Sequence, residues 1–182
     1  MAWRAYLVPK IGTGALADPW RPKYVFESFA GVKTDGCDYG KEDLFLVWAE
    51  LTPAQHTTLT ANGDVFGFAA DPFATVGAGA LTALQNALEA RNIPGTWVAS
   101  GTTNGAVFAR LKMLFRLMRR VAKRWPDAAL FSGRTLNTLI GDLPANARTA
   151  LNDGAQDLGL NTSGITLAMT IRQALVTLMG QV

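Results

Sequence analysis

The spacing of apolar residues changes character part-way along the chain. In the first 70 residues, apolar residues form short runs or alternate with polar ones, which is typical of β-strands. This pattern predicts strands over residues 2–8, 23–29, 44–50 and 65–68, and a polar loop over 33–43. A short helix is predicted over residues 53–61, because Thr52 is a favoured N-cap and Pro53 suits the first helical position.

From residue 78 onward the apolar residues follow the three–four spacing of amphipathic helices. Helices are predicted over residues 80–90, 103–125, 135–140, 145–158 and 166–179, separated by segments rich in Pro, Gly and Asn. The predicted fold class is therefore α+β. A small N-terminal α+β subdomain (1–72), with an extended loop at 12–23, precedes an all-helical C-terminal half (78–182).

Charged and apolar residues are most clearly separated in residues 107–125 of the predicted helix 103–125, called helix 107–125 below. It carries an apolar stripe that we expect to form the core of the helical half, with Phe108, Leu111, Phe115, Met118 and Trp125. Seven cations fall on the other side, interrupted only by Met113 and Leu117: Arg110, Lys112, Arg116, Arg119, Arg120, Lys123 and Arg124. No acidic residue occurs between Glu89 and Asp127, so this helix should bury one face and turn a basic face outward.

Three interpretations of this basic face are open: contact with a partner protein, contact with nucleic acid, or a solvated surface. Like charges four residues apart repel each other by a few tenths of a kcal/mol, which favours a counter-charge from a partner. A phosphate backbone could supply that charge. However, the helix has no aromatic residues on its basic side for stacking on bases, and the net charge is only +3. We therefore expect a protein partner.

No catalytic signature accompanies this helix. The G-x-G-x-x-A sequence at residues 12–17 is followed at once by Asp18-Pro19, which prevents the helix that dinucleotide binding requires. The single His56 and the single Cys37 would form a nucleophile pair only if the fold brought them together. The acidic residues Asp35, Asp38, Glu42 and Asp43 lack the alternation of a calcium loop. We expect no enzymatic activity, no cofactor and no metal.

Two further expectations concern location and exposed anchors. The longest apolar run, residues 44–49, is too short to span a membrane and no signal peptide is evident, so an intracellular, soluble protein is expected. Trp3 and Trp48 lie on predicted strands and are expected in the core. Trp20, between two prolines, is a candidate interface anchor or a residue that folds back onto its own domain.

From residue 51 onward the chain resembles uncharacterised structural (virion) proteins of tailed bacteriophages. The resemblance is carried by residues 51–56 (LTPAQH), 88–94 (LEARNIP), 143–148 (LPANAR) and 171–175 (IRQAL). It implies a virion component made in the host cytoplasm, of the neck, tail or head–tail connector, which assembles with other virion proteins or as a repeated subunit. The alternative is a nucleic-acid-binding module that uses the basic face of helix 107–125.

Overall fold

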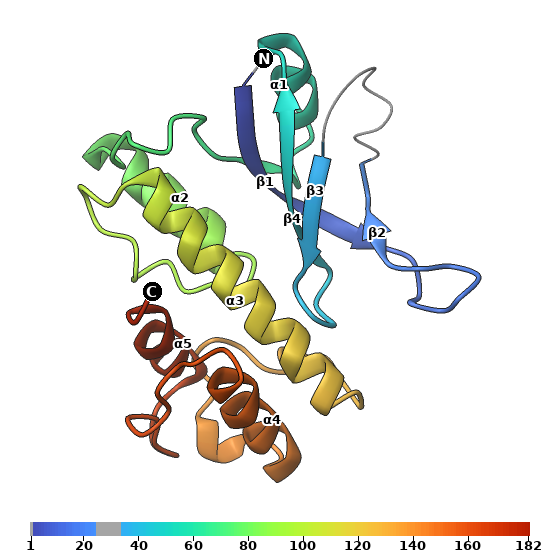
Figure 1. Cartoon of the computed structure of the whole chain (residues 1–182), viewed down its shortest axis with the longest axis vertical. Helices are drawn as coiled ribbons and strands as arrows, with labels where there is room; N and C mark the ends of the chain where they lie inside the picture. The colour runs from blue at the N-terminus through green and yellow to red at the C-terminus, as the bar shows by residue number, and fades with distance from the viewer. Residues whose placement is uncertain (1, 25–33) are drawn as a thin grey trace.

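The computed structural model describes residues 2–24 and 34–182 and has an α+β fold, with a curled antiparallel sheet in the N-terminal part and helices in the C-terminal half (Figure 1). The strands are β1 (Ala2–Ile11), β2 (Arg21–Pro22), β3 (Thr34–Asp38), β4 (Leu44–Leu51) and β5 (Phe66–Gly67). The helices are α1 (Pro53–Thr60), α2 (Ala78–Glu89), α3 (Asn104–Arg124), the 3-10 helix η2 (Ile140–Asp142), α4 (Ala145–Gln156) and α5 (Ile171–Met179). The predicted order, a sheet followed by helices, is confirmed.

The sheet is organised around the long pairing of β1 with β4. Its strand order is β2-β1-β4-β3, with β5 also paired to β1, and every pairing is antiparallel. The β1–β4 register runs from Ala2 opposite Leu51 to Pro9 opposite Leu44. Directly after β4, Thr52 begins α1 with a capping box to Gln55, as its sequence predicts.

The two faces of the sheet pack against different helices, because successive residues of a strand point to opposite sides. Ala5, Leu7 and Leu46 belong to the same buried cluster as the helices of the C-terminal half. Tyr6 and Val47, on the other face, pack with Leu59 of α1 in a separate, smaller cluster.

Helix α3 lies between the sheet and the helices α4 and α5 (Figure 1). Phe115 is fully buried, and its ring stacks on Tyr39 with 4.6 Å between centroids. Leu117, on another side of the helix, is also fully buried and lies against Gly154 of α4. One continuous core therefore runs from the sheet through α3 to α5. The division into units 1–72 and 78–182 stays a prediction.

Two predicted elements are wrong. Residues 33–43, expected to be a loop, contain β3, because Thr34–Asp38 pairs along its whole length with β4 and this pairing outweighs the low strand propensity of Asp and Gly. Residues 135–140, expected to be a helix, contain a turn and the isolated bridge of Leu139 with Thr170, and only Ile140 belongs to a helix, the 3-10 helix η2. Here the hydroxyl groups of Thr135 and Thr138 accept hydrogen bonds from backbone N–H groups and so compete with helical bonding.

Several boundaries also differ from the prediction. The last helix begins at Ile171, where Thr170 and Gln173 form a capping box, and not at residue 166. Strand β1 extends past Pro9 to Ile11, and β5 has only two residues. Of the strand predicted over 23–29, residues 25–29 lie outside the described residues, while Lys23 and Tyr24 form a bend. In the part of the chain that is described, no helix is long and apolar enough to cross a membrane.

Candidate functional site

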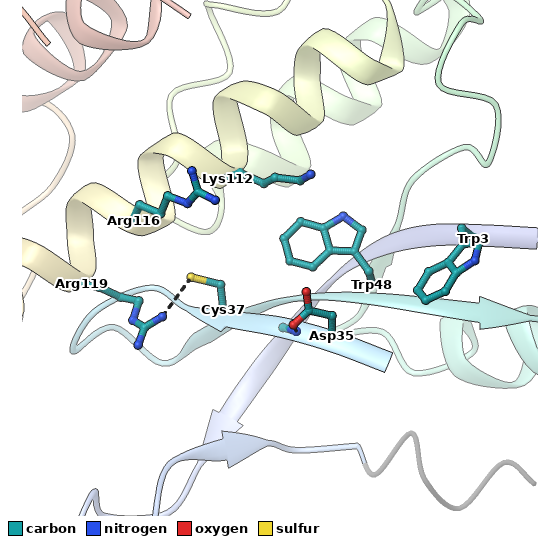
Figure 2. A pocket seen from close by; sticks show the side chains of 8 residues that line it. Trp3, Asp35, Cys37, Trp48, Lys112, Arg116 and Arg119 are labelled. Atoms are coloured by element: carbon teal, nitrogen blue, oxygen red, sulfur yellow. Dashed lines mark hydrogen bonds between the residues drawn. The ribbon is translucent and has the colours of Figure 1, made fainter. Parts of the chain in front are cut away.

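A groove of about 450 Å³ opens between α3 and the sheet face that α3 covers (Figure 2). Its sheet side is formed by three strands and its helix side by one helix. The lining residues are Trp3, Asp35, Gly36, Cys37, Trp48, Lys112, Arg116 and Arg119. A volume of this size lies within the range of about 300–1,000 Å³ that is usual for ligand sites.

Strand register places the sheet residues on one wall. Trp48 of β4 is paired with Asp35 of β3, and Trp3 of β1 is paired with Glu50, two residues further along β4. Residues paired across antiparallel strands point to the same face, so both indoles and the Asp35 carboxyl group belong to the groove side. Trp3 is 47% exposed, which corrects the expectation that it lies in the core. The alternation of residues along the strand places Trp3 on the correct face of the sheet, but α3 does not cover this end of that face.

The helix side carries three cations, because positions four and three residues apart share one face of a helix. The Lys112 Nζ lies 5.3 Å from the centroid of the Trp48 ring, a cation–π contact. The Arg119 Nε lies 3.7 Å from the Asp38 Oδ1, and its Nη1 lies 3.9 Å from the Cys37 Sγ. Arg116 has no hydrogen bond or ion pair to any described residue, and Figure 2 shows it on the groove side of α3.

The groove is electrostatically unbalanced. Its own carboxylate, Asp35, accepts the backbone N–H of Gly36 at 2.7 Å and makes no ion pair with a described cation. Burial raises the pKa of the Cys37 thiol, although Arg119 beside it acts in the opposite direction, so the thiol is neutral near pH 7. The concave surface thus combines two indoles with an excess of positive charge. Such a surface can bind an anionic ligand that also carries apolar or aromatic groups.

No family model, curated protein or solved structure matches this chain. Function is therefore inferred from the groove and from the residues around it.

The remaining predicted cations of α3 do not form one outward face. Arg110 donates to the carbonyl oxygen of Trp97 at 2.8 Å and lies over its ring. Arg120 and Arg124 both form ion pairs with Asp157, just beyond α4. They flank the contact made by Leu117, which the sequence placed on the basic side. Lys123 is exposed and has no hydrogen bond or ion pair within the described chain.

Trp20 lies outside the groove. It is 38% exposed and packs against Gly14, while Lys10 Nζ lies 4.4 Å from the centroid of its ring. The indole therefore folds back onto its own chain, one of the two arrangements expected for it. Its use as an interface anchor stays a prediction.

The structure separates the two residues that would form a thiol nucleophile pair. The His56 Nδ1 lies 2.9 Å from the Tyr6 hydroxyl oxygen, on the sheet face that α1 covers, whereas Cys37 faces α3. Burial raises the pKa of Tyr6 to about 12 and lowers the pKa of His56. Residues 12–17 form a turn with no helix. Within the described ranges no cluster of His, Cys, Asp and Glu could hold a metal ion.

Sequence reasoning missed the aromatic half of the groove. The sequence pattern predicts Lys112, Arg116 and Arg119 as exposed cations of a helix that carries no aromatic residue on its basic side. The aromatic residues instead come from the sheet, from Trp3 and Trp48. A signal was present, because alternation places Trp3 and Trp48 on the same faces as the core residues Ala5 and Leu46. The missing information was which helix lies opposite them.

Proposed function

We propose that this protein is a non-enzymatic structural component of a tailed-phage virion that binds a neighbouring protein chain in the groove between α3 and the sheet. The resemblance of residues 51–56 and 143–148 to virion proteins supports the setting. The groove supports the mode of action. The observation that carries the proposal is the open juxtaposition of Trp3 and Trp48 with Lys112, Arg116 and Arg119.

The residue types of the groove are those that dominate binding energy at protein interfaces. Trp and Arg are enriched among the few residues whose truncation costs most of the affinity, and they act best in concave, partly desolvated sites. Trp3 offers an exposed indole, and Arg116 offers a guanidinium group without an ion pair to any described residue. A protein segment seated here gains both apolar burial and charge-assisted hydrogen bonds.

The arrangement of the other cations argues against duplex DNA as the main ligand. A phosphate backbone needs a continuous track of free cations. On α3 this track is interrupted, because Arg120 and Arg124 already share Asp157 and Arg110 donates to a backbone carbonyl group. Of the seven cations, Lys112, Arg116 and Lys123 have no ion pair within the described chain, and Arg119 has only a long one, 3.7 Å, to Asp38.

Single-stranded nucleic acid is the second candidate. It is favoured by the position of two indoles opposite three cations, since bases stack on aromatic rings while phosphates contact Lys and Arg. One contact disfavours it: Lys112 already lies over the Trp48 ring, so a base can stack on that face only by displacing the ammonium group.

Two measurements on the purified full chain separate these ligands. The first is fluorescence anisotropy with labelled duplex and single-stranded DNA. We expect weak, non-saturating binding at physiological salt, because few phosphate contacts are available. Saturable submicromolar binding that Arg116→Ala abolishes and Lys123→Ala preserves would overturn the proposal in favour of nucleic acid.

The second measurement is selection of a random-peptide display library on the wild-type protein, with counter-selection on the Trp3→Ala/Arg116→Gln double variant. We expect peptides that bind the wild type with saturation and lose that binding on the double variant. Far-UV circular dichroism of the variant checks that its fold is intact. If every enriched peptide binds both proteins equally well, the groove is not a protein-binding site.

A further inference from the structure

We infer that the occupant of the groove is an extended acidic segment of a different protein, with carboxylates at alternate positions and apolar or aromatic side chains between them. The inference rests on the proposed function, because it takes the groove to be a protein-binding site. It adds the chemistry and the spacing of the partner segment, and it excludes a second copy of this chain as the source.

The charge of the groove determines the sign of the partner. Lys112, Arg116 and Arg119 face a single lining carboxylate, and that carboxylate is held by the Gly36 N–H. Arg119 is shared between Asp38 and Cys37 at the long distances of 3.7 and 3.9 Å, so it can turn toward an incoming anion. Carboxylates match guanidinium groups in geometry as well as in charge, since two parallel N–H groups can donate to both carboxylate oxygens.

The spacing of the cations is compatible with an extended partner. A helix rises about 1.5 Å per residue, so Lys112 and Arg116 are about 6 Å apart along α3. An extended chain rises about 3.3 Å per residue and repeats its side-chain direction every second residue, about 6.6 Å apart. Carboxylates two residues apart on an extended segment therefore match Lys112 and Arg116. A third, two residues further on, comes within reach of the flexible Arg119 side chain.

The opposite wall determines the residues between the carboxylates. When alternate side chains of an extended segment point to α3, the intervening ones point to the sheet. There they meet the exposed Trp3 indole and the part of Trp48 that Lys112 leaves open. Apolar or aromatic side chains bury surface against both rings. The segment is thus acidic on one side and apolar on the other.

This chain cannot supply such a segment from a second copy. None of its 14 acidic residues has another acidic residue two positions away. Its most closely spaced carboxylates are the adjacent pair Glu42 and Asp43, and the pair Asp35 and Asp38, which are three residues apart. These 182 residues therefore do not supply the segment, and we assign it to a different protein.

Fluorescence anisotropy with a labelled peptide tests the inference. The peptide carries Asp or Glu at three alternate positions with Phe between them, and it is titrated with the full chain. We expect saturable binding that weakens as salt rises, because the carboxylate–cation pairs are screened. Arg116→Gln and Trp3→Ala should each weaken binding about tenfold, by removing a charged hydrogen bond and an aromatic anchor respectively.

Matched controls test whether binding depends on the groove residues and not on nonspecific electrostatic or hydrophobic attraction. Lys123→Gln removes an exposed cation from the same helix outside the groove, and Phe73→Ala removes an aromatic residue that is 87% exposed elsewhere. Both should leave the affinity unchanged. A second peptide of identical composition, with its acidic residues contiguous, should bind about tenfold more weakly. A third, with Asn and Gln in place of Asp and Glu, should show no saturable binding.

The remaining outcomes count against the inference. Equal binding of the alternating and contiguous peptides overturns the extended geometry, and equal binding of the amide peptide overturns the role of charge. If the alternating peptide does not bind but display yields groove-dependent peptides of another pattern, the inference fails and the proposed function stands. If oligo-dT binds more tightly than any peptide and loses binding with Arg116→Gln and Trp3→Ala, the proposed function fails as well.

Discussion

Phe115 of α3 is fully buried and stacked on Tyr39, the residue that follows β3. Phe115→Ala should lower the free energy of unfolding by about 3–5 kcal/mol, because it removes a buried ring and leaves a cavity that a close-packed core fills only in part. Urea denaturation measures this change. The control is Phe73→Ala, at an exposed ring, where a change within about 0.5 kcal/mol is expected. An unchanged midpoint for Phe115→Ala would contradict the burial of this face of α3.

The stability of the fold should depend on pH through Glu42. Its Oε1 accepts the Phe131 N–H at 3.0 Å, and burial raises its pKa although that hydrogen bond and Lys10 act in the opposite direction. A carboxyl group whose pKa is higher in the folded state holds its proton more tightly there. The stability it confers is therefore complete below the unfolded-state pKa and is lost as pH rises through the folded-state pKa.

The variant Glu42→Gln keeps an oxygen that can accept the Phe131 N–H but never acquires a charge. We expect its free energy of unfolding, relative to that of the wild type, to increase as pH rises from about 4 to about 7. Urea midpoints of both proteins across this range provide the measurement. The difference between the proteins isolates Glu42 from the other titrating groups, and a difference that does not change with pH would refute the prediction.

The burial of a residue was predictable where the periodicity of its own helix or strand is sufficient to assign it. The three–four spacing identified Leu111, Phe115 and Met118 as buried, because each faces inward whatever packs against the helix. Trp3 was misplaced for the opposite reason. Alternation specifies the face of a strand, but the length of that face which a helix covers depends on how α3 crosses the sheet, and no local pattern encodes this crossing.

At the scale of elements, Gly40 determines how closely the β3–β4 turn approaches α3. Its φ of +61° lies in the left-handed region, and a Cβ there would lie 2.4 Å from the Met118 carbonyl oxygen. Lys10 Nζ also donates to the Gly40 carbonyl oxygen at 2.8 Å, which fixes the same turn from the other side. The turn therefore has room only for glycine.

Gly40→Ala should be destabilising by at least about 1–3 kcal/mol from the backbone conformation alone, with a further loss as the turn moves away from α3. Gly63→Ala is the matched control, since no atom lies within 4 Å of its added Cβ. Thermal unfolding followed by circular dichroism compares the two. A Gly40→Ala variant as stable as Gly63→Ala would mean that the turn does not contact α3.

Elements were predictable where their own sequence was sufficient. Helix α3 and strand β4 each carry enough apolar residues in one periodicity to be recognised, and Thr52 caps α1 where expected. Strand β3 was missed because Asp35, Gly36 and Asp38, three of its five residues, are disfavoured in strands, and the segment becomes a strand by pairing with β4. The groove depends on that same pairing, so its sheet wall could not be assembled from local signals.

At the scale of the whole molecule, one core connects the sheet to the C-terminal helices through α3. A continuous core predicts a single cooperative unfolding transition. Tryptophan fluorescence and far-UV circular dichroism should give the same urea midpoint, since Trp48 reports on the sheet, Trp97 and Trp125 report on the helical half, and the circular dichroism signal reports mainly on helices. Two separated midpoints would instead support independent units at 1–72 and 78–182.

The position of α3 also has a consequence for synthesis on the ribosome. The sheet is encoded first, yet α3, which covers one of its apolar faces, does not end until Arg124. While the intervening residues are being made, Ala5, Leu7 and Leu46 have no partner helix to cover them, and an emerging chain with exposed apolar strands is prone to aggregate. We therefore expect the N-terminal part of the nascent chain to need chaperone protection, or delayed strand pairing, until α3 has left the exit tunnel.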